Sequence, residues 1–446
     1  MKCALCTSLA VAALLGQFQP IFPSPFVAAA NPDALAFKRP FPTTHRGGSS
    51  VEGLSPDNKP INFHKNKPAV PPPKATLAAL EATVTDEFIA NTIEQVALSS
   101  NYSSSIIIKY KPDRAWLWSR WHGTVLQSSL PKVALNTGIT LLVGIALRQA
   151  CGSTWSVGMV PDAECVIIAR LKAVDKLFHY LQSFVTFILT FFLGKSFDLW
   201  REMYKVGRGI QGKMSDIGIL LATHAKRHSQ TGPLTDDAKA FLSTVARRLR
   251  LFHILTWASQ SRQFQVLLTN RGMTQLMQRG FLSNSELDAL LQLPLPPTQR
   301  QNAVLEWIIL DCNQARRSGV IDDTGAYFKM LLQKICELRG TASSISDLVD
   351  GRMPLAYAHL VQLLVDSFLF AAPMALFSEL GMWAVLCVAF MTLFYAGLLD
   401  LAKIFLDPLN NEDYCEGGVD MDLGVFIRES NAGSMRWMQG LEVLPN

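Results

Sequence analysis

Charged side chains are scarce in this sequence. They make up 17% of the 446 residues, against about 25% in a typical soluble domain, while hydrophobic residues make up 49% and the mean hydropathy is +0.20. This composition excludes a disordered chain, a coiled coil and a collagen-like chain. The net charge of +5 is too small to indicate a nucleic-acid-binding protein.

Cysteine and catalytic motifs are also sparse. Eight cysteines in 446 residues are too few for a disulfide scaffold, and the one Cys-x-x-Cys pair, Cys3–Cys6, lies at the extreme N-terminus. The sequence contains no HExxH motif, no phosphate-binding loop, no GxSxG elbow and no cluster of His and Cys with zinc spacing. We therefore do not expect an enzyme.

The N-terminus resembles a targeting sequence in two parts. Residues 1–30 contain Lys2, a short apolar run and three closing alanines, as a secretory signal does. Residues 31–75 are basic, hydroxyl-rich and acid-poor, which is typical of a disordered transit peptide. In series, with the Ala36–Phe37 step, they resemble the removable presequences of algae whose plastids lie inside extra membranes. A disordered tail behind a secretory signal is the alternative.

Four apolar segments form two pairs. Each has about the length that a membrane helix requires; they are Val133–Ala150, Leu177–Leu199, Leu360–Leu380 and Trp383–Phe405. We predict an all-α membrane protein, divided into an amphipathic N-terminal region (76–131), two spans (132–200), a helical domain (201–356), two further spans (357–405) and a C-terminal acidic loop and tail (406–446).

The long polar stretch between the two pairs predicts helices outside the membrane. A capping box, Ser283-x-x-Glu286, opens the first of three expected helices; they are Ser285–Leu293, Gln299–Arg317 and Ala326–Leu338, the last closed by Arg339–Gly340. Basic residues after the second span favour the cytoplasmic or stromal side for this domain. The loop from Gly152 to Asp175 then faces the opposite compartment, where Cys151 and Cys165 are either bridged or two separate thiols.

Five short stretches follow the order and spacing of motifs in one known family. They are Trp121–Thr124, Ser196–Trp200, Leu267–Leu287, Asp350–Tyr357 and Asp407–Asn410. Together with the layout of the spans, they resemble the bestrophin family of anion channels. The resemblance implies a homopentamer in a lipid membrane, with one pore on the five-fold axis that passes chloride or bicarbonate. It also implies a thylakoid location, where plastid members supply bicarbonate for carbon concentration.

The second span, with the pore helix at 177–199, carries the candidate pore neck. Ser183, Phe187, Phe191 and Lys195 recur every four residues and so form one stripe on a helix. The resemblance implies three neck rings at this spacing; one register uses Phe187, Phe191 and Lys195, and the other uses Ser183, Phe187 and Phe191. Helix packing or lipid contact is the alternative for the phenylalanines, and snorkelling to the interface is the alternative for Lys195.

The resemblance also implies two sites outside the spans. A second, cytosolic constriction has Trp307, Ile308 and Ile309 as candidates. Animal members bind calcium after the last span, where Glu412 and Asp413 are weak candidates here because Tyr414 and Cys415 interrupt the acidic run. We therefore expect no cofactor.

Three other side chains in the apolar segments are candidates for a function. His179 lies one turn before Ser183 and could extend the stripe, although an ordinary packed or interfacial histidine is the simpler interpretation. Asp366 and Asp400 are acids within apolar spans, where ionisable groups are costly.

Two other functions remain open. A structural membrane protein without a permeation pathway would have the same hydropathy. A secondary anion transporter usually shows internal repeats, and none relates the two span pairs.

Overall fold

The computed structural model describes residues 76–97, 105–107, 110, 112–119, 121, 124–151, 166–229, 232–322, 324–412, 414 and 421–439. The predicted targeting segments, 1–30 and 31–75, lie outside the described residues. Within the described part, the ordered elements are helices, and two isolated β-bridges, Ala225↔Ile321 and Arg227↔Leu234, are the extended pairings. The all-α prediction is confirmed.

The helices fall into three sets along the chain. The N-terminal set is α2 (Leu77–Thr83), α3 (Asp86–Val96) and α4 (Arg114–Trp118). The apolar set is α5 (Val125–Cys151), α6 (Val166–His224), α12 (Leu355–Leu380), η3 (Gly381–Trp383) and α13 (Ala384–Phe405). The remaining set is α7 (Asp236–Gln260), η1 (Gln265–Leu268), α8 (Asn270–Gln278), α9 (Asn284–Gln292), η2 (Pro297–Gln299), α10 (Arg300–Arg317), α11 (Gly325–Asp350) and α14 (Leu423–Gln439).

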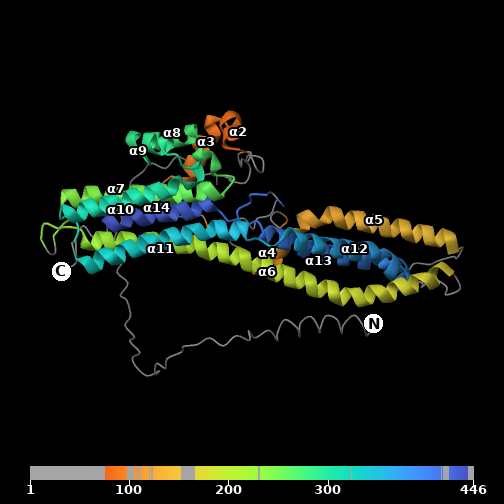
Figure 1. Ribbon diagram of the computed structural model, residues 1–446. Coiled ribbons are helices and arrows are strands. Elements are labelled where there is room, and N and C mark those ends of the chain that lie inside the picture. The colour runs from red at the N-terminus through yellow and green to blue at the C-terminus, as the bar shows by residue number, and fades with distance from the viewer. Residues whose placement is uncertain are drawn as a thin grey trace, which may run out of the picture. The chain divides into compact units, whose positions relative to one another are not determined.

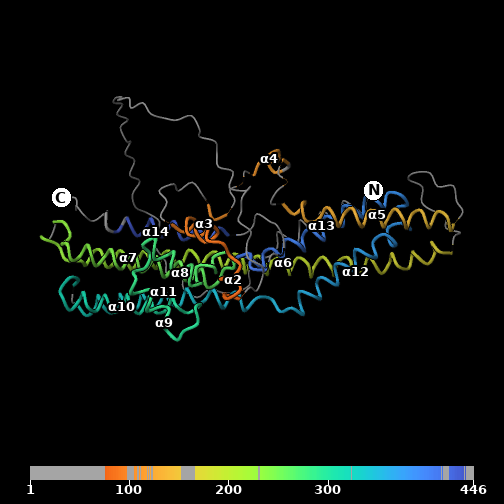
Figure 2. The backbone as a smooth tube through the Cα atoms, turned by 90° about the horizontal axis from the view of Figure 1, so that it is seen from above, coloured from red at the N-terminus to blue at the C-terminus, as the bar shows by residue number. Residues whose placement is uncertain are grey.

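Helix α6 belongs to two packed groups at once. Figures 1 and 2 show its N-terminal part beside α12 and α13, against which α5 also packs, and its C-terminal part beside α7, α11 and α14. Each group has its own core: Phe178, Val185 and Phe192 are buried in the apolar bundle, and Met203 and Ile210 in the helical domain. The 59 residues of α6 therefore connect the bundle and the domain without a break.

Three segments are long and apolar enough to cross a membrane: Val125–Cys151, Val166–His224 and Leu355–Phe405. The last contains two helices, α12 and α13, which pack against each other across η3. Gly381 begins this turn with φ of +56°, a conformation that favours glycine. The chain is thus a membrane protein with four apolar helices, as its hydropathy predicts.

Three helix starts in the helical domain follow local capping rules. The hydroxyls of Thr235, Thr269 and Ser283 each accept a hydrogen bond from the backbone N–H three residues later. At Ser283 the Glu286 carboxylate completes the predicted capping box by accepting from the Ser283 N–H. The predicted helices at 285–293 and 299–317 are confirmed as α9 and α10 to within one residue.

Two predicted helices are longer than expected. The helix expected to close at Arg339–Gly340 continues to Asp350, because Ala342 and Ile345 extend its buried face and a glycine inside a helix costs only about 1 kcal/mol. The second span begins eleven residues earlier than Leu177 and continues past Leu199 to His224. Residues 166–175 of the predicted loop are therefore helical, since Ile168 and Asp175 are buried in the bundle.

The sequence left open whether Cys151 and Cys165 are bridged or are two separate thiols. Cys151, the last residue of α5, is disulfide-bonded. Cys165 lies outside the described residues.

Candidate functional site

Helix α6 has a packed side and an uncovered side within the bundle. On the packed side, Val185, Leu189 and Phe192 are at most 1% exposed. Phe192 lies against Tyr357 of α12, with ring centroids 5.8 Å apart. The Thr186 hydroxyl is 2.7 Å from the Tyr395 hydroxyl of α13. These contacts fix the rotation of α6 about its own axis.

The predicted pore stripe lies on the uncovered side. Phe187 is 65% exposed and Phe191 is 50% exposed, and Ser183 is also exposed. No described helix of the chain covers these side chains, so packing inside the subunit does not explain the stripe. These side chains therefore face another copy of the chain, a lipid or an aqueous pore.

Lys195 extends the stripe by one turn and is half-exposed. Its ammonium lies 5.8 Å from the centroid of the Phe191 ring and 3.9 Å from the Asp198 carboxylate. Asp198 also accepts a hydrogen bond of 3.1 Å from Arg201. This end of the stripe therefore carries two cations, Lys195 and Arg201, and one carboxylate, Asp198.

The family model described as "Bestrophin, RFP-TM, chloride channel" matches residues 170–415. This range is more than half of the chain and contains the whole stripe. The chain belongs to the bestrophin family.

Two comparisons agree with this membership. Bestrophin homolog 22 of Caenorhabditis elegans is 22% identical over 309 residues, which are 66% of this chain and 56% of the relative, so the chain spans little more than half of the relative's length. The crystal structure of a bacterial bestrophin homolog from Klebsiella pneumoniae has a TM-score of 0.52 at 14% identity, over 70% of this chain and 98% of that one. A variant of that bacterial protein gives the same TM-score over 69% of this chain and 98% of the variant. At this identity the structural likeness shows the fold alone.

The candidates for a second constriction in this bestrophin lie on α10. Ile308 is fully buried in the core of the helical domain, so it is not available to line a passage. Trp307 and Ile309 are only partly buried and pack against the edge of that core. Leu310, the next residue, is 63% exposed.

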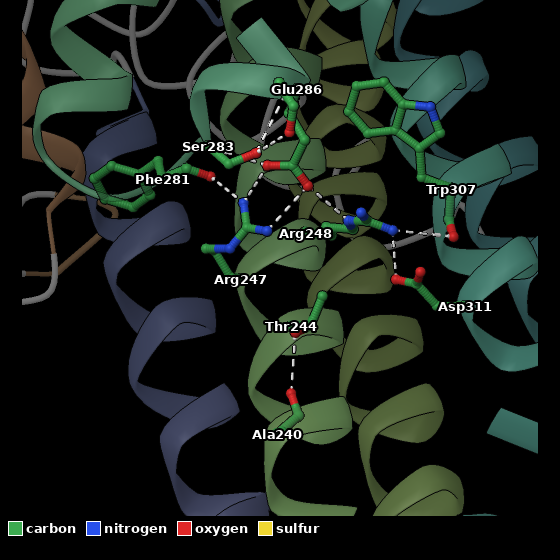
Figure 3. Close-up of polar contacts among 10 residues, drawn as sticks. Ala240, Thr244, Arg247, Arg248, Phe281, Ser283, Glu286, Trp307 and Asp311 are labelled. Atoms are coloured by element: carbon green, nitrogen blue, oxygen red, sulfur yellow. Dashed lines mark hydrogen bonds and ion pairs between the residues drawn. The ribbon is translucent and has the colours of Figure 1, made fainter. Parts of the chain in front are cut away.

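Trp307 is held by an ionic network that the sequence did not predict. The Arg248 guanidinium lies 5.6 Å from the Trp307 ring centroid and donates to the Trp307 carbonyl at 3.2 Å (Figure 3). It also pairs with Asp311, and with Glu286 at 2.8 Å. Arg248 thereby connects α7, α9 and α10 at the Trp307 position.

Glu286 is the centre of this network. Arg247 donates two hydrogen bonds to its carboxylate, at 2.5 and 2.9 Å (Figure 3). Burial alone would raise the pKa of Glu286, but the hydrogen bonds from Arg247, the Ser283 backbone and Arg248 lower this pKa to about 2. The carboxylate is therefore ionised at any physiological pH. The capping box gave a signal for Glu286 but none for its two arginine partners, which are more than 30 residues away.

The weak calcium candidates lie after α13. Glu412 pairs with Arg352 at 3.1 Å, and its N–H donates to the Asp407 carboxylate at 2.8 Å. Asp407 also accepts from the Asn411 N–H at 2.9 Å, so both of its oxygens are used within the turn. Asp413 lies outside the described residues. The described acids of this turn are thus committed to internal partners.

The two acids inside the spans have different surroundings. Asp400 is 3% exposed and accepts from the Lys132 ammonium of α5 at 2.6 and 2.7 Å, which neutralises its charge within the bundle. Asp366 is exposed and accepts from Gln362 at 2.5 Å, one turn earlier on α12. The Lys132 partner was not predicted, because 268 residues separate the pair.

Proposed function

We propose that this bestrophin is a passive anion channel, formed by five copies of the chain around a pore that the α6 stripe lines. The observation that carries the proposal is the rotation of α6. Its packed side is fixed by α12 and α13, and its opposite side presents two large aromatic rings to no partner in the subunit. In a ring of subunits, that side is free to face the common axis.

The chemistry of the stripe suits a weak anion site. Five copies each of Phe187 and Phe191 would make two stacked apolar rings, and such a constriction resists wetting and acts as a gate. The edge of a phenyl ring carries partial positive charge, so rings turned edge-on stabilise an anion without a fixed charge. Lys195, stacked over Phe191, would add positive charge at the end of the stripe near the helical domain.

We further propose chloride and bicarbonate as the permeant ions and a plastid membrane, the thylakoid, as the location. The support for the location is the presequence-like composition of residues 1–75. Expression of the tagged full chain in algal cells, followed by separation of plastid and secretory membranes, tests it. Recovery in a secretory membrane would contradict it.

The test of the channel is a current measurement. The purified chain is placed in planar bilayers under chloride and bicarbonate gradients, beside Phe187→Ala/Phe191→Ala. We expect a reversal potential that follows the anion gradient, and altered gating in the double variant.

A matched control is Phe394→Ala, which removes a ring that is 62% exposed but lies on α13 and not on the α6 stripe. It should leave gating unchanged. A well-folded pentamer without current would favour the structural membrane protein, and current driven only by a coupled ion would favour a secondary transporter. A chain that forms no pentamer would contradict the proposed pore.

A further inference from the structure

Three side chains of metal-ligand type meet near the beginning of α6. Asp175 and His179 are one turn apart on α6, and Glu379 is in the last turn of α12. One ligand atom from each lies within 4.8 Å of the other two. No second group of three His, Cys, Asp or Glu side chains meets this criterion in the described part of the chain.

The burial of Asp175 is the feature of this group that packing alone explains least well. It is only 5% exposed, and its Oδ1 atom is buried without a hydrogen-bond partner. The nearest group of opposite character is His179, whose Nε2 lies 3.5 Å from that oxygen. Burial of an uncompensated carboxylate is unfavourable, so a cation at this point would stabilise the fold.

We propose that Asp175, His179 and Glu379 bind a divalent transition metal ion, and that Zn²⁺ fits best. Zinc accepts one imidazole nitrogen with carboxylate oxygens, at about 2.0–2.2 Å from the metal. Two such ligands in a tetrahedron are about 3.3–3.5 Å apart, which matches the separation of 3.5 Å between His179 Nε2 and Asp175 Oδ1. Calcium prefers six to eight oxygens and does not suit a site with a histidine.

The site lies at the surface of the subunit. The His179 side chain is 54% exposed and Glu379 is exposed, so an ion can enter without unfolding the bundle. Three protein ligands leave one position of a tetrahedron for water. An exposed Glu379 can rotate to close the remaining distance to the metal.

One consequence rests on the proposed function. Without metal and with neutral His179, the site carries two negative charges; with Zn²⁺ bound, it carries none. His179 is one turn before Ser183, so five empty sites would place ten negative charges at one end of the stripe. Zinc would remove this repulsion and increase anion current, most strongly at low ionic strength.

The test begins with metal binding. The purified full chain is dialysed against micromolar Zn²⁺, and bound zinc is measured by mass spectrometry beside Glu379→Gln and His179→Gln. The exposed His359, near the other end of α12, gives the matched control His359→Gln. We expect about one zinc per chain in the wild type and the control, and at least tenfold weaker binding in the two site variants.

Equal zinc affinity in all four proteins would overturn the proposal. Because Glu379 is exposed, its variant is not expected to disturb folding. Co²⁺ substitution gives an independent readout: a visible d–d band without thiolate absorption is expected in the wild type and not in Glu379→Gln. If added Zn²⁺ changes neither the stability nor the spectrum of the wild type, the group is an ion pair only, and the metal site is rejected.

The channel and the metal site can fail separately. Zinc binding in a chain that carries no current would contradict the proposed function and leave the metal site standing. If zinc binds but does not change the anion current, only the proposed effect of zinc on the current is rejected.

Discussion

The two groups of helices that share α6 are built by different rules. In the helical domain, large side chains such as Trp257, Phe252 and Phe264 are at most 1% exposed, and charged residues lie around a closed core. In the apolar bundle, the most hydrophobic windows of α5, of α6 and of the segment Leu355–Phe405 are only 17%, 22% and 33% buried inside the subunit.

This difference shows what covers the apolar side chains of each region. The helical domain buries its largest apolar side chains within one chain, as a soluble domain does. The bundle leaves apolar side chains such as Phe187, Phe370 and Phe394 more than half exposed. Exposed apolar surface on this scale indicates contact with lipid or with other copies of the chain.

The sharpest comparison uses two adjacent phenylalanines on α6. Phe192→Ala removes a ring that is 1% exposed and should lower the free energy of unfolding by about 3–5 kcal/mol. Phe191→Ala removes a ring that is 50% exposed and should change it by less than about 0.5 kcal/mol. Chemical unfolding in detergent micelles measures both. Equal losses would mean that the stripe is packed within the subunit.

A substitution in the ionic network shows how far the stability of the helical domain depends on a few buried charges. Glu286→Ala leaves Arg247 and Arg248 without their shared carboxylate, and we expect a loss of about 3 kcal/mol. Thermal unfolding followed by circular dichroism measures the change. The control, Glu337→Ala, breaks surface pairs with Lys213 and Lys334 and should have little effect.

A buried histidine makes the stability of the helical domain depend on pH. His253 is fully buried, and its Nε2 accepts a hydrogen bond from the Trp257 indole at 2.8 Å. Burial lowers the pKa of His253 to about 3, below the usual 6.5. The unfolded chain therefore binds the proton first, so the stabilisation is complete above pH 6.5 and is lost as the pH falls toward 3.

The expected loss from His253 is about 2 kcal/mol between pH 7 and pH 5. His253→Gln keeps an acceptor for Trp257 but does not titrate, so its unfolding free energy should vary less over this interval. Unfolding curves at both pH values check the difference. An identical pH dependence in the two proteins would show that His253 does not contribute.

The smallest expected effect is a gain in stability. Gly340 lies inside α11, is exposed, and a Cβ atom there would meet no other atom within 4 Å. Gly340→Ala should therefore stabilise the helical domain by about 0.5–1 kcal/mol, through the lower entropy of the unfolded chain. Thermal unfolding measures it. A loss of stability would mean that α11 is interrupted at this position.

Local patterns in the sequence were enough to place four of the helices. The capping box at Ser283 and the apolar segments each depend on neighbouring residues, and α9, α10, α12 and α13 lie where the sequence predicts them. Helix ends set by long-range packing were missed. A glycine such as Gly340 ends a helix only where the following residues have no core to pack against. Here Ile345 is buried in the core, so the helix continues.

The candidate site shows the same division. The spacing of Phe187 and Phe191 places them on one helix stripe whatever the fold. That this stripe is uncovered, while Phe192 beside it is buried, depends on how α12 and α13 pack against α6. The pairs Lys132–Asp400 and Arg248–Glu286 could not be predicted, because each joins residues far apart in the chain.

The sequence by itself therefore determined the membrane class, the helical fold and the family resemblance, because hydropathy and periodicity are properties of neighbouring residues. Only the tertiary structure decided which side of α6 is free, which buried charges are neutralised, and that Asp175, His179 and Glu379 meet. The physical reason is that burial and ion pairing depend on which helices lie side by side, and that arrangement brings together residues as distant as Asp175 and Glu379.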